Sequence, residues 1–380
     1  MIKPLAITGI GQSRFVGTRN EVSLQELIFE CASNALADAG IDRKAIDSVV
    51  LSASDLVDGR GIASMSSAAA AGAYMKHETR TTNDGLYALI LASLEILAGR
   101  SRVSLVMSWN KSSEGDWLAA SPTAFEPLYA RPAGLDGPTM LGLEASAMLL
   151  DSQVDHATAD RAVARNRRNA SANSRIGMSS ASKAHAANVA PWPLMGADIP
   201  WPGDGAYGIV LADPQYVAPK KRPYAFVRGF AWGTGTGNPA ERPSAVDCLA
   251  ATAERAYRDA GIGSLDAIDL IELVSRSSFE EVAVLSGLVK PLGGNANALI
   301  NDGETERDGD LPVNPSGGSS GLYLTQSAGL AAAVEVSRQL SSKAGPVQIP
   351  GAKTGIAHGQ SGPALQSNAV AILSATAGAD

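Results

Sequence analysis

The chain has few of the residues that build disulfide frameworks and metal sites. Among 380 residues there are two cysteines and four histidines, and their spacing matches no metal-ligand motif. Cys31 and Cys248 both stand among small apolar residues at helical spacing, where a buried structural thiol is favoured over a reactive one. We therefore expect no disulfide framework, no bound metal and no thiol chemistry at these positions.

Long apolar runs, positive charge and aromatic side chains are also scarce. No stretch reaches the roughly 18 apolar residues of a membrane-spanning helix, and the N-terminus lacks a basic region followed by a long apolar segment. The net charge of -7 argues against nucleic-acid binding. Aromatic residues make up only 5% of the chain, which suits closely packed helices on covered sheets. We expect a cytoplasmic, layered α/β protein without nucleic-acid or membrane partners.

One helical segment occurs twice. SLQELIFECASNALADAGI at 23–41 returns as SAVDCLAATAERAYRDAGI at 244–262. Each copy starts with a Ser suited to the N-cap and stops at a Gly suited to the left-handed C′ position. Apolar runs follow both copies, at 49–51 and at 270–274, and are expected to be buried strands. The repeat predicts two similar α/β halves with a site between them.

We expect the first half to span residues 1–215 and the second half 216–380. From about 110 to 200 the periodicity weakens and Pro, Trp, Ser and Gly accumulate around one predicted helix at 157–171. This segment is expected to be an insertion that shapes a substrate entrance. The other elements expected are helices at 85–98 and 329–340, strands at 103–107, 203–213, 224–230, 346–349 and 368–373, and a Gly-rich loop at 355–362.

Four stretches together resemble the thiolase superfamily, and within it the sterol-carrier-protein-type thiolases and the steroid side-chain-cleaving aldolases. These stretches are ITGIGQSRF at 7–15, GDGAYGIVLAD at 203–213, LPVNPSGG at 311–318 and AVEVSRQL at 333–340. The resemblance covers nearly the whole chain. It implies a duplicated five-layer α/β/α/β/α fold, usually dimeric, which agrees with the repeat.

The resemblance also shows that the usual catalytic side chains of thiolases are replaced. Thr82 stands where the nucleophilic Cys precedes the helix that begins at Gly85. Tyr323 stands in place of the His of the Gly-His-Pro turn, and His358 in place of the second Cys. The Asn of a fourth loop is absent, because RSSF occupies 276–279.

These replacements favour retro-aldol chemistry over thiolysis. Thiolysis needs a covalent acyl-enzyme, and a Thr hydroxyl is a weak nucleophile without a base. Cleavage of a β-hydroxyacyl-CoA needs only a base and donors that hold a thioester enolate. We predict Tyr323, His358 and Thr82 as the catalytic residues, although a packing Tyr, a loop His and a helix-capping Thr are the structural alternatives. The functional alternatives are an acetyl-CoA acetyltransferase-like thiolase with a non-standard site, and a non-catalytic acyl-CoA-binding or scaffold subunit.

Two groups of residues are predicted to bind the substrate. Backbone N–H groups in two Gly-rich turns are candidates to hold the enolate oxygen. Three arginines at positions i, i+4 and i+7 of the insertion helix are candidates for the phosphates of coenzyme A, with a solvated charged face as the alternative. The candidates are Ser316, Gly317, Gly318, Gly359 and Gly362 for the turns, and Arg161, Arg165 and Arg168 for the helix. Coenzyme A is expected only as part of the substrate, with no tightly bound cofactor.

The resemblance implies two kinds of protein partner. One is a second copy of the chain, in a homodimer. The other is a small subunit with an oligonucleotide-binding-type barrel and a zinc ribbon, because the Pro-rich segment at 191–193 and Trp201 form too small an insertion to enclose a CoA thioester. We also predict that the helices beginning at Gly85 and Gly329 meet at the centre, with Tyr323 and His358 in one pocket beside them.

Overall fold

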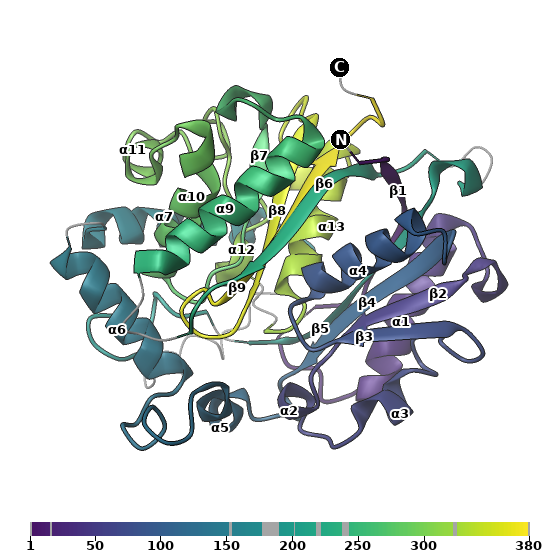
Figure 1. Cartoon of the computed structure of the whole chain (residues 1–380), viewed down its shortest axis with the longest axis horizontal. Helices are drawn as coiled ribbons and strands as arrows, with labels where there is room; N and C mark the ends of the chain where they lie inside the picture. The colour runs from purple at the N-terminus through teal and green to yellow at the C-terminus, as the bar shows by residue number, and fades with distance from the viewer. Residues whose placement is uncertain are drawn as a thin grey trace.

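The computed structural model describes residues 2–15, 17–151, 154–176, 190–200, 202–217, 222–237, 243–321 and 325–378. Within these ranges the strands form one mixed sheet in the order β3-β2-β4-β5-β1-β6-β9-β8-β7 (Figure 1). The strands are β1 (Leu5–Gln12), β2 (Ser48–Ser52), β3 (His77–Thr81), β4 (Val103–Lys111), β5 (Asp204–Ala212), β6 (Ala225–Thr234), β7 (Leu270–Glu272), β8 (Thr354–Ser361) and β9 (Ser367–Ser374).

The sheet consists of two half-sheets with the same topology. In the first half β2 runs parallel to β3 and to β4, and β5 is antiparallel to β4 and β1. In the second half β7 runs parallel to β8 and forms a parallel bridge to Val313, while β9 is antiparallel to β8 and β6. A short antiparallel pairing of Leu5–Ile7 with Ala225–Val227 joins the two halves.

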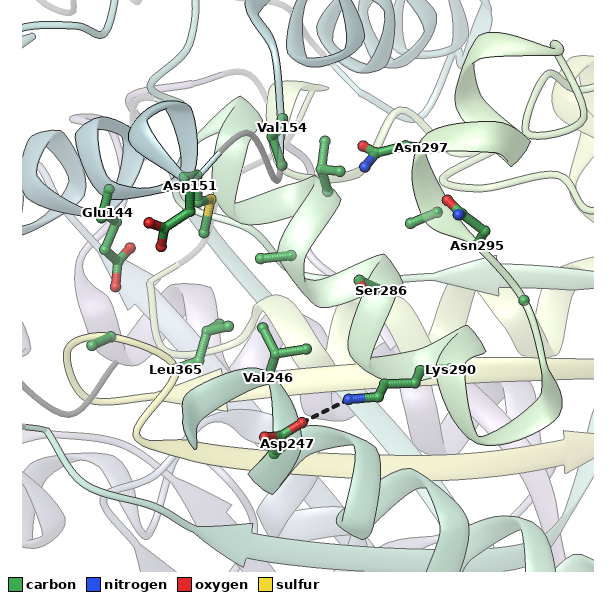
Figure 2. A pocket seen from close by; sticks show the side chains of 17 residues that line it. Glu144, Asp151, Val154, Val246, Asp247, Ser286, Lys290, Asn295, Asn297 and Leu365 are labelled. Carbon is green, nitrogen blue, oxygen red and sulfur yellow. Dashed lines mark hydrogen bonds and ion pairs between the residues drawn. The ribbon is translucent and has the colours of Figure 1, made fainter. Parts of the chain in front are cut away.

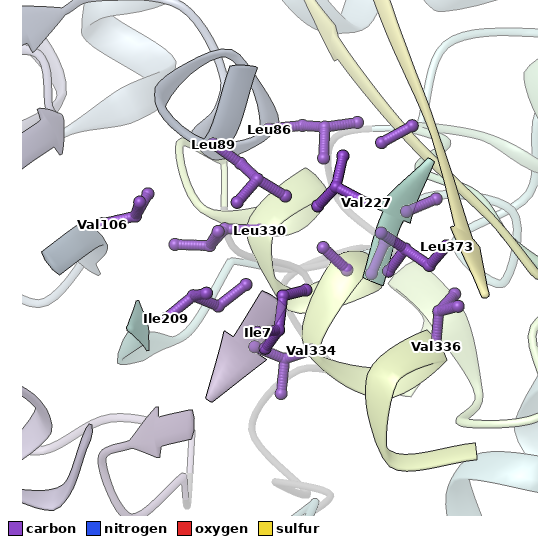
Figure 3. Close-up of a cluster of buried hydrophobic side chains, with 14 of the residues drawn as sticks. Ile7, Leu86, Leu89, Val106, Ile209, Val227, Leu330, Val334, Val336 and Leu373 are labelled. Carbon is purple, nitrogen blue, oxygen red and sulfur yellow. The ribbon is translucent and has the colours of Figure 1, made fainter. Parts of the chain in front are cut away.

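Two helices form the central layer between the half-sheets. These are α4 (Gly85–Leu97) and α13 (Ala328–Leu340), and both are buried along most of their length. Figure 3 shows Leu86 and Leu330 meeting strand residues of both halves in one hydrophobic cluster. Because these helices are covered on every side, apolar residues occur all round them rather than on one stripe.

The outer layers complete the five-layer arrangement. Helix α1 (Leu24–Ala39) packs in a second hydrophobic cluster with β2, β4 and β5. Helices α9 (Pro243–Ala260) and α10 (Ser278–Val289) pack in a third cluster with β7, β8 and β9 (Figure 1). The predicted thiolase-like α/β fold is confirmed.

Close helix-to-strand packing explains the small residues of the repeat. A Cβ atom on Gly9 of β1 would lie 2.5 Å from the Ala35 carbonyl oxygen, and one on Gly229 of β6 would lie 2.4 Å from that of Ala256. Only glycine fits beneath the helix at these two equivalent positions. The first copy has the expected Ser23 cap, and the helix of the second copy, α9, begins at Pro243.

The insertion is richer in helix than predicted. Helix α7 (His156–Ala172) confirms the expected element, but α6 (Gly137–Leu150) was not predicted. Its apolar residues lie on both its buried and its exposed sides, so the period of an amphipathic helix is weak. Shorter helices are α2 (Asp55–Asp58), α3 (Ala63–Ser67), α5 (Trp117–Ala120), α11 (Ala296–Asn301) and α12 (Gly318–Gly321). None of the helices in the described ranges has the length and apolar character needed to cross a bilayer.

The C-terminal hairpin differs from the prediction. Residues 345–347 form a short 3₁₀ turn rather than a strand. The Gly-rich segment expected to be a loop is instead strand β8, which pairs with β9 through its whole length. The glycines of this segment led to the prediction of a loop. In the structure they are needed because α4 and α13 pack closely against β8.

Candidate active site

Asp84 links the starts of the two central helices. Its Oδ1 accepts a hydrogen bond from the Leu86 N–H at 2.8 Å, as an N-cap of α4. Its Oδ2 accepts from the Gly329 N–H, also at 2.8 Å, at the start of α13. Ser327, which occupies the N-cap position of α13, forms no capping bond with its own side chain. One carboxyl group therefore caps a helix in each half of the chain.

Glycines make room for this carboxyl group. A Cβ atom on Gly329 would lie 2.0 Å from Asp84 Oδ1, and one on Gly359 of β8 would lie 2.2 Å from it. A Cβ atom on Gly85 would lie 2.7 Å from the Leu330 Cβ. The two helix starts thus meet at the centre of the molecule, as the repeat predicts.

Burial controls the charge of Asp84. The residue is 1% exposed, and burial raises the pKa of its carboxyl to about 7. The backbone N–H groups of Leu86 and Gly329 lower this pKa, but they offset only part of the desolvation. Near neutral pH the group is divided between its protonated and ionised forms.

Polar contacts from Gln326, just before α13, and from Ser361, at the end of β8, hold the segment before α4. The Gln326 carbonyl accepts from the Gly85 N–H at 2.8 Å, and the Gln326 Nε2 donates to the carbonyls of Thr82 at 2.8 Å and Asn83 at 2.5 Å. The Ser361 hydroxyl, at the end of β8, accepts from the Asp84 N–H at 2.7 Å. These bonds fix the backbone while the Thr82 side chain stays exposed.

Thr82 therefore has the accessibility that a substrate-contacting residue needs. The nearest carboxyl group in the sequence, that of Asp84, points to the two helix starts and accepts backbone N–H bonds there. It is engaged with the fold rather than oriented as a base for the Thr82 hydroxyl. This geometry suits Thr82 better to hydrogen bonding than to nucleophilic attack.

His358 lies in strand β8, not in a loop, and is fully buried. Its Nδ1 accepts from the Val274 N–H at 3.4 Å, and its Nε2 lies 3.1 Å from Asn368 Oδ1. Burial lowers the pKa of the ring to about 4, so it is neutral at physiological pH. With both nitrogens engaged inside the protein, the ring is poorly placed for the proton transfer that the sequence suggested.

The turn at 314–318 uses its backbone donors internally. The Ser316 N–H donates to the Glu272 carboxyl group. The Gly317 N–H donates to the Asn314 carbonyl, and the Gly318 N–H donates to the Ser316 hydroxyl. A Cβ atom on Gly317 would lie 2.6 Å from the backbone of α7, which explains the glycine. These N–H groups are not available to an enolate, contrary to the prediction. Gly359 is likewise packed on Asp84, and the Gly362 carbonyl accepts from Arg276 at 2.7 Å.

A second buried carboxyl group lies beneath this turn. Glu272 Oε2 accepts from the Ser316 hydroxyl at 2.7 Å, and burial, together with the charge of Glu335, raises the pKa of Glu272 to about 8. Glu335 is paired with Arg175 at 2.5 Å. Both acids are among the residues that line a small cavity of about 30 Å³. The sequence did not reveal this cluster, because Glu272, Ser316, Glu335 and Arg175 come from four distant segments.

The three arginines of α7 do not share one exposed face. Arg165 is 1% exposed, is paired with the buried Glu281 and donates to the Thr305 hydroxyl at 2.7 Å. Burial lowers the pKa of its guanidinium. Arg161 and Arg168 are exposed, and Arg168 is paired with Glu306. Arg165 therefore supports the packing of the insertion, and only the other two can meet a phosphate in solution.

Arg276 begins the RSSF segment that stands where the resemblance implies the fourth loop. It is ion-paired at 2.5 Å with Glu280, whose pKa the guanidinium holds below its usual value against the effect of burial. Gln360 also donates to Glu280, at 2.9 Å. The pair holds the 275–280 segment against the end of β8. An Arg four residues before a Glu at the start of a helix was the available sequence signal.

The two cysteines of the chain lie away from the central helices. Cys31 is buried in α1, which raises the pKa of its thiol, and Cys248 is half-buried in α9. Both helices belong to the outer layers. Tyr323 and Trp201 lie outside the described residues. Within the described ranges no three His, Cys, Asp or Glu side chains are grouped as metal ligands would be.

Comparison with known protein sequences gives one family and several relatives. Residues 238–375 match the family described as thiolase C-terminal domain-like. An acetyl-CoA acetyltransferase of Methanothermobacter thermautotrophicus is 25% identical, over 94% of this chain and 96% of that protein. Sterol carrier protein 2 of the rat is 36% identical over 108 residues, which are 28% of this chain and 19% of that protein.

Solved structures extend the likeness of fold to the whole chain. The Ltp2-ChsH2(DUF35) aldolase superposes with a TM-score of 0.82 at 19% identity and covers 98% of both chains. Human mitochondrial 3-ketoacyl-CoA thiolase superposes with a TM-score of 0.70 at 13% identity, over 98% of this chain and 99% of that one. At these identities the superpositions show a shared architecture.

Proposed function

Because this chain belongs to the thiolase superfamily, on its sterol-carrier-protein-like branch, we propose that it is an enzyme that cleaves a carbon–carbon bond of a β-hydroxyacyl-CoA by retro-aldol chemistry. The relatives support action on acyl-CoA thioesters. The choice of reaction depends on the side chains at the start of α4.

The absence of a thiol at this helix start carries the proposal. Thr82 occupies the position that the family resemblance gives to the nucleophilic Cys, and both cysteines of the chain lie on the outer helices α1 and α9. The nearby Asp84 carboxyl is buried and bonded to backbone N–H groups. Because Asp84 is engaged with the two helix starts, it is not oriented to activate the Thr82 hydroxyl, so a reaction without a covalent intermediate fits better.

The retro-aldol step needs only proton transfers and a place for the enolate. A base removes the proton of the β-hydroxyl group, the oxygen electrons form a carbonyl, and the Cα–Cβ bond breaks. The electron pair of that bond becomes the thioester enolate, which takes a proton at Cα. The products are a ketone or aldehyde and a shortened acyl-CoA. We assign the base to Tyr323 by the resemblance, and hydrogen bonding to the enolate to the exposed Thr82 hydroxyl.

The second candidate function is acyl transfer. It is favoured by the full-length relative that is an acetyl-CoA acetyltransferase and by the exposure of Thr82 at the nucleophile position. In that reaction Thr82 would carry the acyl group between two thiols.

A panel of β-hydroxyacyl-CoA thioesters tests the two reactions. The purified chain, with and without a candidate small subunit encoded beside it, should release a carbonyl product and a shortened acyl-CoA. Tyr323→Phe should lower this rate by roughly 10²–10⁴ and leave acyl-CoA binding nearly unchanged. A Cys31→Ala, Cys248→Ala double variant is the control and should stay within a few-fold of the parent rate.

Other results would overturn the retro-aldol proposal. Cleavage of a 3-ketoacyl-CoA by free coenzyme A, with an acyl adduct on Thr82, would establish acyl transfer. Binding without turnover in either assay, with the small subunit present, would leave a scaffold role.

We also propose that the chain works as a homodimer in the cytoplasm and binds a small subunit. Strand β3 ends the described sheet and is half-exposed, and such an edge offers backbone groups to a partner strand. The aldolase neighbour is named for two components, which supports a second subunit. A monomer by light scattering, with full activity of the isolated chain, would contradict both parts.

A further inference from the structure

The backbone donors at the two central helix starts are engaged within the protein. Each N–H group from Asn83 to Tyr87 has an acceptor there, and so has the N–H group of Gly329 at the start of α13. Unbonded N–H groups at a helix start would be the usual donors to an anion. The enolate oxygen of the proposed reaction therefore needs side-chain donors at this place, and the exposed Thr82 hydroxyl is one of them.

Ser361 extends one of these backbone donors toward solvent. Its Oγ accepts the Asp84 N–H at 2.7 Å, which fixes the oxygen and leaves the hydroxyl proton to be donated onward. The residues that the structure describes provide no acceptor for this proton, and Ser361 is partly exposed, whereas Asp84 is 1% exposed. A hydroxyl that already accepts one hydrogen bond is polarised into a better donor for the next.

The strand geometry directs Ser361 to the centre. Gly359, two residues earlier in β8, packs on Asp84, because its Cβ atom would lie 2.2 Å from Asp84 Oδ1. Alternate residues of a strand share one face, so Ser361 faces the start of α4 as Gly359 does. Ser361 is the last residue of β8 and is bonded two residues from Thr82 along the chain. The two hydroxyl groups thus belong to the same helix start.

The turn that follows Ser361 is fixed from its other side. The Gly362 carbonyl accepts from Arg276, and the Leu365 carbonyl accepts from Asn368 Nδ2, both at 2.7 Å. Leu365 lines a cavity of about 560 Å³ between α6, α9, α10 and α11 (Figure 2), and none of the described residues that line it comes from α4 or α13. Ser361 is therefore held between a paired strand and a fixed turn, as a preorganised donor must be.

We propose that the Ser361 hydroxyl donates a hydrogen bond to the thioester oxygen of the substrate and stabilises it as the enolate forms. This assignment rests on the proposed function, because it needs an acyl-CoA at the start of α4. In the reaction, the electron pair of the breaking Cα–Cβ bond moves toward the thioester oxygen, and Ser361 keeps its proton while it holds the charge. Loss of one such donor lowers the rate of an enzyme by roughly 10²–10³.

Exchange of Cα protons with deuterium tests this role without carbon–carbon cleavage. A base takes the Cα proton of acetyl-CoA or propionyl-CoA, the electron pair moves to the thioester oxygen, and a deuteron from D₂O returns to Cα. The full chain, with the candidate small subunit present, should catalyse this exchange in an NMR assay. Ser361→Ala should slow the exchange by roughly 10²-fold. The Kd of the two thioesters should stay within about threefold, because the donor acts mainly on the enolate.

Two further variants separate the hydroxyl from the fold. Ser361→Thr keeps a hydroxyl at a strand end, where a β-branched residue fits, and should stay within about fivefold of the parent rate. Ser367→Ala is the matched control, because Ser367 pairs with Ser361 in the hairpin but its hydroxyl contacts that of Thr234 at 3.1 Å. It should stay within about twofold. If Ser361→Ala does not fold, Ser361→Cys gives the same comparison, since a thiol is a weak donor.

The outcomes separate this assignment from the proposed function, because cleavage of the β-hydroxyacyl-CoA panel is measured with the same variants. Exchange that depends on Ser361, without cleavage of any member of the panel, would support the donor and contradict the retro-aldol reaction. Exchange and cleavage at the parent rates in a folded Ser361→Ala variant would overturn the donor and leave the reaction standing. A parent chain that binds the thioesters but neither exchanges nor cleaves would contradict both.

Discussion

The two central helices begin at equivalent places in the two halves, yet they are capped in different ways. Helix α4 has its own cap, Asp84, whereas α13 has Ser327 at the corresponding place and receives its capping bond from Asp84. The Ser327 hydroxyl has no hydrogen-bond partner among the described residues. The duplicated fold is thus symmetric in its strands and helices, and asymmetric in the polar groups at the centre.

This difference shows where the halves depend on each other. Outside the centre the halves are joined by the short pairing of β1 with β6, by apolar contacts and by polar contacts of the insertion, such as the ion pair of Arg165 with Glu281. At the centre, one buried carboxyl group satisfies backbone donors on both sides, so its loss affects the two halves at once. The predictions below test that asymmetry.

The largest effect is expected for Asp84→Ala. The substitution removes the caps of two helices and leaves the N–H groups of Leu86 and Gly329 buried without acceptors. The free energy of unfolding should fall by about 3–5 kcal/mol, measured by chemical denaturation. Asp84→Asn keeps one acceptor oxygen and should lose about half as much. Equal stability of the Ala variant and the parent would mean that the shared cap is unimportant.

A smaller loss is expected for Gly329→Ala. The new Cβ atom would lie 2.0 Å from Asp84 Oδ1, so the carboxyl group must move and the capping geometry is lost. We expect a destabilisation of about 1–3 kcal/mol in thermal or chemical unfolding. Gly263→Ala is the control, because nothing lies within 4 Å of its Cβ position, and it should change stability by less than about 0.5 kcal/mol.

The pH dependence of stability should identify the titration of Asp84. Its folded-state pKa of about 7 lies above the ordinary value of 3.8, so between these pH values the folded chain holds a proton that the unfolded chain has lost. Stability contributed by this group therefore falls as the pH rises toward 7. The unfolding free energy of the parent should decline more steeply than that of Asp84→Asn, by at most about 1.4 kcal/mol per pH unit. Glu272 and His358 should titrate alike in the parent and in Asp84→Asn, so they do not contribute to the difference between the two proteins. If the unfolding free energies of the two proteins change in parallel with pH, Asp84 is ionised throughout this pH range.

The smallest effect is expected for Ser327→Ala. The hydroxyl of Ser327 makes no capping bond, and removing it deletes no observed interaction within the described structure. Stability should change by less than about 0.5 kcal/mol, against the loss of several kcal/mol at Asp84. A loss comparable to that of Asp84→Ala would show that the two helix starts are capped equivalently in solution.

The sequence predicted what depends on local patterns. The repeat, the cap at Ser23 and the helix starts predicted at Gly85 and Gly329 followed from turn residues and periodicity, and α13 begins one residue earlier, at Ala328. The double role of Asp84 could not be predicted, because its second donor lies 245 residues away. The burial of Arg165 depends in the same way on Glu281, which the helix pattern does not reveal.

Glycine was the least informative residue in the sequence. In β8 it indicated a loop, but the structure uses Gly359 to admit the Asp84 carboxyl beside a strand. His358 was predicted from its place in the resemblance and from the Gly-rich segment around it, and its burial in a strand removes the second of these reasons. Tyr323 remains a prediction from the resemblance alone.

The position of β1 in the sheet has a consequence for synthesis on the ribosome. This first strand pairs with β5, at residues 204–212, and with β6, which begins at residue 225. More than half of the chain must therefore be made before the first strand has either neighbour. Strand pairing between segments so far apart in the sequence forms slowly. Until it forms, the apolar side chains of β1 stay exposed. We expect nascent chains that stop short of β5 to be retained by chaperones, and those that extend past β6 to become resistant to protease.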